Sequence, residues 1–472
     1  MGQEISSTGF EEADFTAFSD QLARETAALR DHHANGRLSG EGPRIGLELE
    51  AWLVDRNYWP APHNQSFLHR LSDPFVVPEL SRFNIEVNAE PAGLAGNGLR
   101  ELEEHLDSTW KRCVANAHED VDTVVAIGTL PTLRESDLSL DNMTPSNRYA
   151  ALNNELVRLR ENRPLQIDID SHHEDWPHLR TEHLDCMLEA ATTSFQLHLQ
   201  VPPEELAGNL NASMILSGPL VALAANAPFL FGQPLWHETR IAIFEQSIEQ
   251  AGDDDALHRV TFGTGYAGDD PTAIFAENLD NYPALLPIAG ENEAEFPCLR
   301  LHNGTIWRWN RPLVGFDDDG TPHLRIEQRV MPAGPSVIDM IANAAFYYGA
   351  VYMLADRCKA PELPFEAARD NFYAAAKHGM GGTFTWFDGA KHSARDLLAK
   401  LVPLAREGLA EQGVPEELAD RYLDVIEQRI ATGRNGAAWQ LAHFRKHGDV
   451  FRLTADYLEH QRSGMPVHEW PV

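Results

Sequence analysis

The 472-residue sequence has little cysteine, and the cysteines that it has are far apart. They are Cys113, Cys186, Cys298 and Cys358, and no two of them form a C-x-x-C pair. This spacing excludes a zinc ribbon and a disulfide framework, and it is typical of a protein that works in a reducing compartment. We therefore expect a cytoplasmic protein.

Basic residues are also scarce, since 38 lysines and arginines stand against 71 aspartates and glutamates, for a net charge of −33. A surface of this sign repels phosphate backbones and anionic lipid, which excludes nucleic acid and membrane surfaces as main partners. We interpret the charge as a device for solubility or for salty surroundings. It has one consequence for function. A protein of this charge that handles a polyanion needs divalent cations and clustered arginines to offset its own field.

Long apolar runs are missing as well. No segment approaches the ~18 consecutive apolar residues that are typical of a membrane helix. The first ten residues are polar and lack the basic-then-apolar order of a secretory signal. These two absences favour a protein that neither spans a membrane nor is exported.

The pattern of apolar residues predicts a mixture of helices and strands. Strands are expected up to about residue 95 and again between Cys298 and Val330. The polar, histidine-rich stretch from Asp141 to Asp185 is expected to form a lid or an insertion. Strands interrupted by runs of helix indicate an α+β fold, with an antiparallel sheet that has helices on one side. The expected helices cover residues 11–35, 99–125, 203–250 with a break at 226–228, 336–357 and 393–462.

Four of the expected strands carry apolar side chains on one face and polar side chains on the other, because alternate residues of a strand point to opposite faces. In the first of them, Ile45, Leu47 and Leu49 form the apolar row. The four segments are residues 45–50, 83–90, 195–201 and 324–330, and their polar faces hold Glu48 and Glu50; Asn84, Glu86, Asn88 and Glu90; Gln196, His198 and Gln200; and Arg325, Glu327 and Arg329.

Polar strand faces of this kind have two interpretations. Antiparallel sheets commonly turn one face to solvent, and for any single strand this is the better interpretation. The set of four favours a cation site, because lysine is absent and two glutamates at i and i+2 repel unless a cation lies between them. Carboxylates with one imidazole suit Mg²⁺ or Mn²⁺, and arginines beside them suit phosphate. We therefore predict an enzyme that uses ATP and a divalent cation.

At these positions the sequence resembles glutamate–cysteine ligase family 2, the carboxylate–amine ligases of the glutamine synthetase-like superfamily. The matching stretches follow the family's order over most of the chain. Any one of them alone is a weak signal, whereas together they are specific. They are residues 46–50, 82–88, 224–228 with Arg240, 303–311, 324–329, 371–379 and 432–439.

The resemblance implies a curved antiparallel sheet that forms a funnel, with ATP entering one end and amino-acid substrates the other. It implies a catalytic domain over residues 1–390, including an N-terminal helix, and a helical C-terminal region, residues 391–472, packed on it. The implied reaction is activation of a carboxylate by ATP to an acyl phosphate, followed by attack of an amine. Glutamate and cysteine are the default pair of substrates, with gamma-glutamylcysteine as the product.

The resemblance also implies roles for single residues. One Mg²⁺ or Mn²⁺ site would take Glu48, Glu79 and Glu86, of which Glu79 rests on its spacing alone. A second metal site would take Glu50, His198 and Glu327. Arg329 and Arg325 would stabilise charge on the transferred group, and Arg329 and Gln200 would bind the nucleotide. The residues implied to bind substrate are Arg240, Arg308 and Arg311.

The sequence departs from the family pattern next to His198. Relatives tend to carry a Gly-Thr-His-x-His-like run, whereas this chain has Ser194-Phe-Gln-Leu-His198, with Gln196 in place of the earlier histidine. Two other functions stay open at this point. One is phosphate transfer from ATP to an acceptor without amide formation, and the other is a non-catalytic protein that binds a nucleotide or an amino acid. The oligomeric state is open as well, and a homo-oligomer is one alternative.

Overall fold

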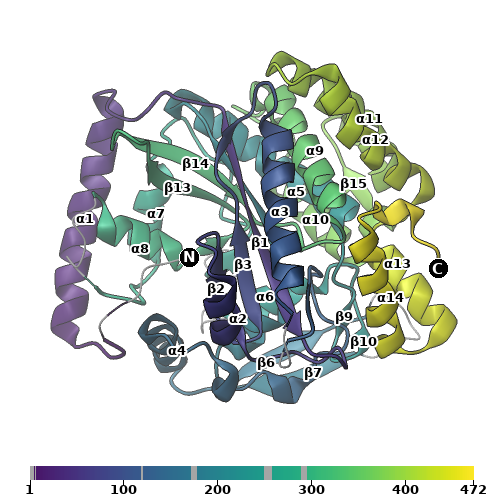
Figure 1. The fold of residues 1–472 in the computed structure, drawn as a ribbon. Helices are drawn as coiled ribbons and strands as arrows, with labels where there is room; N and C mark the ends of the chain where they lie inside the picture. The colour runs from purple at the N-terminus through teal and green to yellow at the C-terminus, as the bar shows by residue number, and fades with distance from the viewer. Residues whose placement is uncertain (1–4, 6, 118–120, 172–177, 249–257, 289–294) are drawn as a thin grey trace.

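The computed structural model describes the chain except for residues 1–4, 6, 118–120, 172–177, 249–257 and 289–294. An antiparallel sheet lies at its centre, with six strands in the order β13-β14-β8-β1-β3-β2 (Figure 1). Two short strands, β4 and β5, pair with the two ends of β1. The strands are β1 (Arg44–Val54), β2 (Val76–Pro78), β3 (Asn84–Asn88), β4 (Ala92–Gly93), β5 (Thr123–Val125), β8 (Phe195–Gln200), β13 (Asn310–Phe316) and β14 (Pro322–Gln328).

The four strands with polar faces are direct neighbours in this sheet, in the order β14-β8-β1-β3. Their register brings the polar positions together. His198 lies opposite both Gly46 and Glu327, and Glu50 lies opposite Glu86. Residues directly opposite each other on an antiparallel pair share one face of the sheet. The predicted polar rows therefore form one continuous face, and the predicted α+β fold with an antiparallel sheet is confirmed.

Two long apolar helices, α5 (Leu206–Ala224) and α9 (Val337–Ala355), pack against each other and against strands of the sheet. The hydroxyl group of Tyr348 on α9 lies 3.0 Å from the carbonyl oxygens of Gly46 and His198, which fixes the helix to β1 and β8. By length and composition both helices pass the test for a membrane span. However, 94% and 78% of their most apolar windows are buried inside the protein, so they are core helices.

Four shorter elements close over the polar face of the sheet. They are α4 (Asn147–Leu159), the short helix η3 (Met187–Ala191), α6 (Thr239–Ser247) and α8 (Pro297–Gly304). Helix α8 is held in turn by α1 (Glu12–Ala34), where the Glu25 carboxylate accepts a hydrogen bond of 2.8 Å from the backbone N–H of Leu299. The polar face is therefore the floor of a cavity and not a freely solvated surface.

The C-terminal helices form a layer at the opposite side of the molecule from α1 (Figure 1). Helices α11 (Ala394–Glu411) and α12 (Glu416–Thr432) pack on α9, and α13 (Gly436–His447) and α14 (Val450–Ser463) follow them. A Cβ at Gly349 of α9 would overlap the carbonyl oxygen of Ala405, so glycine is what allows α9 and α11 to approach this closely.

The remaining elements surround this framework. A hairpin of β15 (Thr383–Thr385) and β16 (Lys391–Ser393) spans residue 390, so the expected boundary between residues 1–390 and 391–472 falls within one hairpin. The two-part division stays a prediction. The other elements are α2 (Asn64–Leu71), α3 (Gly98–Ala115), α7 (Ala273–Asn281), α10 (Phe365–His378), and the strand pairs β6 (Leu165–Ile169) with β7 (Leu179–His183), β9 (Phe229–Leu230) with β10 (Gln233–Pro234), and β11 (Val260–Thr261) with β12 (Trp307–Arg308).

Three expected elements differ from the structure. The helix expected over residues 203–250 is interrupted for longer than the predicted break at 226–228, because β9 and β10 lie between α5 and α6 and α6 begins at Thr239. The helix expected over residues 99–125 ends at Ala115. Residues Thr123–Val125 instead form strand β5, which pairs with β1. The strand expected from Cys298 onward begins as helix α8, since Pro297 stands at its first turn. In the histidine-rich stretch, α4, β6 and β7 are formed, and residues 172–177 lie outside the described part of the chain.

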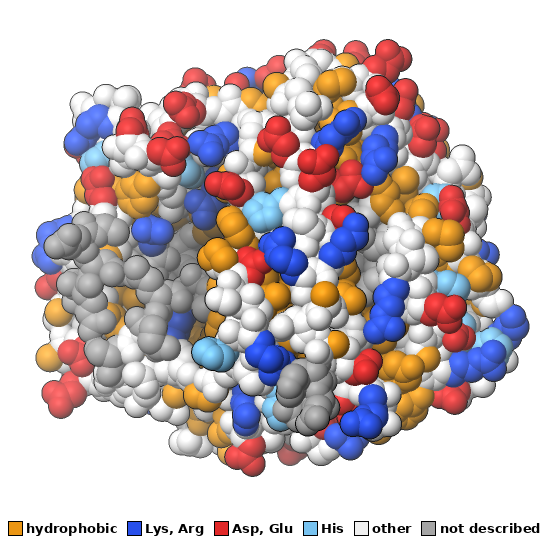
Figure 2. Space-filling model, in the orientation of Figure 1, with side chains coloured by type: hydrophobic (Ala, Val, Ile, Leu, Met, Phe, Trp, Pro, Cys, Tyr) orange, Lys and Arg blue, Asp and Glu red, His pale blue; other side chains and the backbone are white. Residues whose placement is uncertain are grey.

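Charge is distributed over the surface. In the view of Figure 2, acidic side chains are scattered among basic, apolar and neutral ones and are not gathered into one patch. Beneath the sheet, by contrast, one ion pair is fully buried. Arg429 of α12 and Asp339 of α9 are fully buried and lie 2.7 Å apart, and Arg429 also donates to the Asn343 side chain. This pair ties the C-terminal layer to the core.

We expect the substitution Asp339→Ala to lower the free energy of unfolding by about 3–5 kcal/mol, because it leaves the buried Arg429 guanidinium without its counter-charge. Urea denaturation followed by circular dichroism measures this change. The matched control is Asp424→Ala, whose carboxylate is 65% exposed in its ion pair with Arg406, and its cost should stay below about 1 kcal/mol. Equal costs for the two substitutions would contradict the anchoring role of Asp339.

Candidate functional site

A cavity of about 690 Å³ lies over the polar face of the sheet. Its wall contains six carboxylates and five guanidinium groups, an unusual density of charge for a protein interior. Apolar side chains complete the wall, among them Phe244 of the covering helix α6 and Trp307 of strand β12. The charged residues are Glu48, Glu50, Glu79, Glu86, Glu189 and Glu327, with Arg148, Arg300, Arg311, Arg325 and Arg329.

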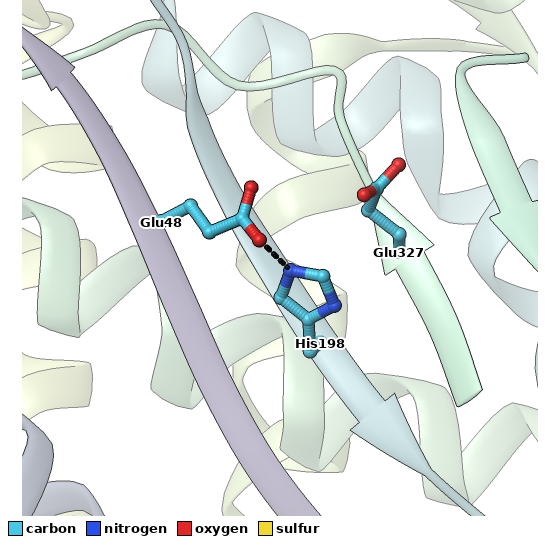
Figure 3. A group of neighbouring side chains, drawn as sticks. All are labelled: Glu48, His198 and Glu327. Carbon is cyan, nitrogen blue, oxygen red and sulfur yellow. Dashed lines mark hydrogen bonds and ion pairs between the residues drawn. The ribbon is translucent and has the colours of Figure 1, made fainter. Parts of the chain in front are cut away.

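Glu48, His198 and Glu327 form the tightest group in the site (Figure 3). They come from three neighbouring strands, β1, β8 and β14, and one ligand atom of each lies within 4.8 Å of those of the other two. The Nε2 atom of His198 lies 3.0 Å from a carboxylate oxygen of Glu48, and its Nδ1 accepts a hydrogen bond of 3.2 Å from Arg325. Two carboxylates and an imidazole nitrogen at this spacing fit a divalent cation.

The two carboxylates of this group are stabilised in their ionised form. Burial disfavours the charge on Glu48, but His198 outweighs burial and lowers the pKa of Glu48 to about 2. Burial also acts on Glu327, and there the guanidinium groups of Arg311 and Arg329 hold the pKa well below its usual range. Both carboxylates are therefore negative at neutral pH and are available as hard oxygen ligands.

A second group of carboxylates, Glu50, Glu79, Glu86 and Glu189, lies on the other side of the cavity. Burial is the largest effect on each, and it raises the pKa of Glu50, Glu79 and Glu86. Negative neighbours add to it, since Glu86 acts on Glu79 and Glu48 acts on Glu86. Burial and the charge of Glu50 raise the pKa of Glu189 to about 8. This half of the cavity has more negative charge than its protein neighbours offset, which also fits a divalent cation.

In the structure the two E-x-E glutamates are grouped differently from what the resemblance implied. The resemblance implied Glu48 with Glu79 and Glu86, and Glu50 with His198 and Glu327. The register groups them differently, because Glu48 is two residues from Gly46, which lies opposite His198, whereas Glu50 is four residues from Gly46 and lies opposite Glu86. Glu48 therefore joins His198 and Glu327, and Glu50 joins Glu79 and Glu86.

Three of the predicted arginines line the cavity. Arg311 of β13 is paired with Glu327 through two hydrogen bonds of 2.8 and 3.1 Å. Arg329 donates to Glu327 at 3.0 Å and to the side-chain oxygen of Gln196. Arg325 donates to His198. Burial lowers the pKa of Arg329, but Glu327 and Glu50 more than reverse this and raise it. The guanidinium groups of Arg325 and Arg329 stand beside the Glu48–His198–Glu327 group.

The other three predicted binding residues lie outside the cavity wall, and their binding roles stay predictions. Arg240 is buried and is bonded to the carboxylate of Glu238 at 2.9 Å and to the backbone carbonyl of Val330. Arg308 points to the other side of its strand, where it donates to Glu277 and Asn278. Gln200 donates to Asp317 at 3.0 Å, near the far end of β8. Each of these side chains is hydrogen-bonded to other groups of the protein.

The sequence pattern missed Glu189, Arg148 and Arg300. Glu189 lies in the short helix η3, which is neither a strand with alternation nor a long amphipathic helix. The one signal available was a single carboxylate inside the apolar run Met187-Leu-Glu-Ala-Ala191. Arg148 and Arg300 come from the covering helices α4 and α8, and their sequence surroundings resemble those of ordinary surface arginines.

Comparison with solved structures shows the class of fold. The chain aligns over 92% of its length with 91% of a glutamate–cysteine ligase from Francisella tularensis, solved in complex with AMP, with a TM-score of 0.56 and 13% identity. It also aligns over 95% of its length with 54% of a bifunctional glutathione synthetase from Pasteurella multocida, with a TM-score of 0.50 and 11% identity. The fold is therefore that of the glutamate–cysteine ligases.

The sequence comparisons then give the family. The family model of glutamate–cysteine ligase family 2 (GCS2) matches residues 44–456, and the chain belongs to this family. A curated relative, a provisionally named glutamate–cysteine ligase 2-1 of Nocardia farcinica (strain IFM 10152), is 33% identical over 138 residues. That alignment covers 28% of this chain and 34% of the relative, so the chain spans about a third of the relative's length.

The raised pKa of Glu189 predicts a specific pH dependence of stability in metal-free protein. Its pKa of about 8 in the folded protein lies above the ordinary value of 4.5, so its protonated form is favoured by folding. The stability that the protonated form contributes is present below pH 4.5 and is lost as the pH rises to 8. The variant Glu189→Gln cannot ionise, and its melting temperature should therefore rise relative to wild type over this interval.

The measurement is a series of melting curves in EDTA between about pH 5 and pH 9, which spans the expected change. Glu182→Gln, on exposed strand β7, serves as the control and should stay parallel to wild type. A constant offset between Glu189→Gln and wild type at every pH would contradict the assignment.

Proposed function

We propose that the protein is an ATP-dependent carboxylate–amine ligase that forms an amide through an acyl phosphate. The observation that carries the proposal is the floor of the cavity, where the Glu48–His198–Glu327 group faces the Glu50–Glu79–Glu86 group. Two such groups fit the two ends of a triphosphate that is bound through divalent cations. Membership of a ligase family supports the same reaction.

The negative and positive side chains of the cavity would have different roles in the proposed reaction. When bound at the two carboxylate groups, Mg²⁺ or Mn²⁺ would supply the positive charge that binds and orients the phosphates. Arg329 and Arg325 stand beside the first group, so we assign them the stabilisation of negative charge on the transferred phosphoryl group. The walls from α4, α6 and α8 would keep water away from the acyl phosphate.

For the substrates we propose glutamate as the acid and cysteine as the amine. This choice is supported by the family and by the names of the relatives. Arg311 contributes less directly than the sequence suggested. Because it is bonded twice to Glu327, it supports that carboxylate in position, and the arginines at the wall, Arg148 and Arg300, are better placed to meet a substrate carboxylate.

The test of the reaction is an assay of ADP release by the purified protein with ATP, Mg²⁺, glutamate and a panel of amines, beginning with cysteine. Mass spectrometry of the product then separates the alternatives. An amide supports the ligase, and a phosphorylated acceptor without an amide identifies a phosphotransferase. If no acid and amine in the panel release ADP, the proposal of a catalytic protein fails.

We expect Glu327→Gln to lower the rate of ADP release by at least about a hundredfold, because it removes one charge from the cation group. Cooperative melting at a temperature near that of wild type would show that the fold is intact. Glu204→Gln, at an exposed site just beyond β8, is the matched control and should retain the wild-type rate. Unchanged turnover in Glu327→Gln would remove Glu327 from the proposed metal ligands.

Metal removal provides an independent test. Turnover should be lost in EDTA and should return when Mg²⁺ is added in excess. Mg²⁺ alone should also raise the melting temperature, since a ligand at about 100 times its dissociation constant stabilises a folded protein by about 2.7 kcal/mol. The increase should be smaller in Glu48→Gln than in wild type, because the variant has lost a carboxylate of the cation group. Turnover that persists after chelation would contradict the role of the cation.

A further inference from the structure

Gln196 occupies the centre of the cavity floor and is the position at which this chain departs from the family pattern. It lies on β8 between Ser194 and His198, is 2% exposed, and lines the cavity. Its register partner is Glu48 on β1. Gln196 is a neutral side chain among charged ones, since its cross-strand neighbour Glu48 and its hydrogen-bond partners Glu50 and Arg329 all carry ionisable groups.

Both ends of the Gln196 amide are engaged. The Nε2 atom donates to a carboxylate oxygen of Glu50 at 2.9 Å and to the hydroxyl oxygen of Ser194 at 3.0 Å. The Oε1 atom accepts a hydrogen bond from Arg329. The orientation of the amide is fixed by its partners, because a carboxylate only accepts and a guanidinium only donates. Gln196 thus joins a carboxylate of one cation group to an arginine of the other.

Glu50 and Arg329 attract each other across this amide. The positive charge of Arg329 favours the ionised form of Glu50, and Glu50 in turn favours the cationic form of Arg329. The other hydrogen bonds of the two side chains are made to different groups. Glu50 accepts from the backbone N–H of Ser194 at 2.7 Å, and Arg329 donates to Glu327 at 3.0 Å. An arginine and a carboxylate that are close together in a buried site form a direct ion pair unless something separates them.

We propose that Gln196 is a positioning residue that keeps Glu50 and Arg329 apart, so that Glu50 stays free to bind a cation and Arg329 stays directed toward Glu327. Each charged group keeps one hydrogen bond to the amide, and neither is neutralised by the other. The inference rests on the proposed function for the identity of the cation, but the separation of the two side chains is a property of the chain itself.

The proposed positioning role makes a specific demand on the side chain at position 196. It must donate a hydrogen bond to Glu50 on one side and accept one from Arg329 on the other. A neutral imidazole meets this demand, since one ring nitrogen donates and the other accepts. A methionine side chain has nearly the shape of glutamine but can neither donate a hydrogen bond nor accept a strong one. The pair of variants Gln196→His and Gln196→Met therefore separates hydrogen bonding from packing.

The first readout is the affinity for Mn²⁺ alone, measured by titration calorimetry without nucleotide or substrate. In Gln196→Met, Arg329 is expected to pair with Glu50, and the affinity should fall by about tenfold or more, the range typical for loss of a group that supports a metal ligand. Gln196→His should stay within about threefold of wild type. Gln328→Met is the matched control, because Gln328 is a fully buried glutamine on β14 whose amide has no hydrogen-bond partner among the described residues.

A double variant tests the cause. If Mn²⁺ affinity is lost because Arg329 pairs with Glu50, then removing the arginine from Gln196→Met, in Gln196→Met/Arg329→Met, should restore at least part of the affinity. A side chain that only filled space would give no such recovery. The second readout is turnover, for which Gln196→Met should lower kcat by about ten- to a hundredfold with the KM for glutamate nearly unchanged.

The outcomes are distinct. Wild-type Mn²⁺ affinity in Gln196→Met would overturn the proposal, and so would equal losses in Gln196→His and Gln196→Met, because packing alone would then account for the position. If Gln196→Met does not fold, the melting curve shows it, and the comparison of Gln196→His with wild type decides. Failure of the wild-type protein to release ADP would contradict the proposed function while leaving the Mn²⁺ comparison valid.

Discussion

The structure is organised around buried negative charge. Six carboxylates line one cavity, and a buried charge is unfavourable unless a partner offsets it. On the side of β8 and β14 the protein supplies the partners itself, since Arg311 and Arg329 hold Glu327, and His198 holds Glu48. On the side of β2 and β3 it does not, and burial raises the pKa of Glu79 and of its neighbours. The cavity is therefore balanced on one side and open to added positive charge on the other.

This asymmetry depends on a rigid support beneath the sheet. Core helices α5 and α9 fill the apolar side, and Tyr348 joins β1 to β8 from below. The close approach of α9 and α11 and the buried Arg429–Asp339 pair extend that support to the C-terminal layer. Charged groups that repel one another can be held a few ångströms apart only when the backbone beneath them does not yield. The layer of helices is thus part of what makes the charged face possible.

Strand alternation in the sequence predicts the floor of the cavity, because successive side chains of a strand point to opposite faces. It placed Glu48, Glu86, His198 and Glu327 on one face, and these residues line or adjoin one cavity. It could not decide which glutamate of the E-x-E pair joins His198, since that depends on the register between β1 and β8. Glu189 was missed for a related reason, because its position follows from how a short helix closes over the sheet and not from any periodicity.

The residues that would carry out the proposed reaction and those that would select its substrates also come from different parts of the fold. The floor comes from strands of one sheet, where the side chains are fixed by register, and phosphoryl chemistry needs fixed charges. The walls come from α4, η3, α6, α8 and strand β12, which are distant in the chain and contribute Tyr149, Glu189, Phe244, Arg300 and Trp307. Apolar wall residues such as Phe244 and Trp307 can change without disturbing the charge balance below them, so under the proposed function proteins with this floor can share one activation step and differ in the amine that completes it. Gln196 lies at the point where the balanced and the open halves of the floor meet, and a change there would alter the chemistry itself.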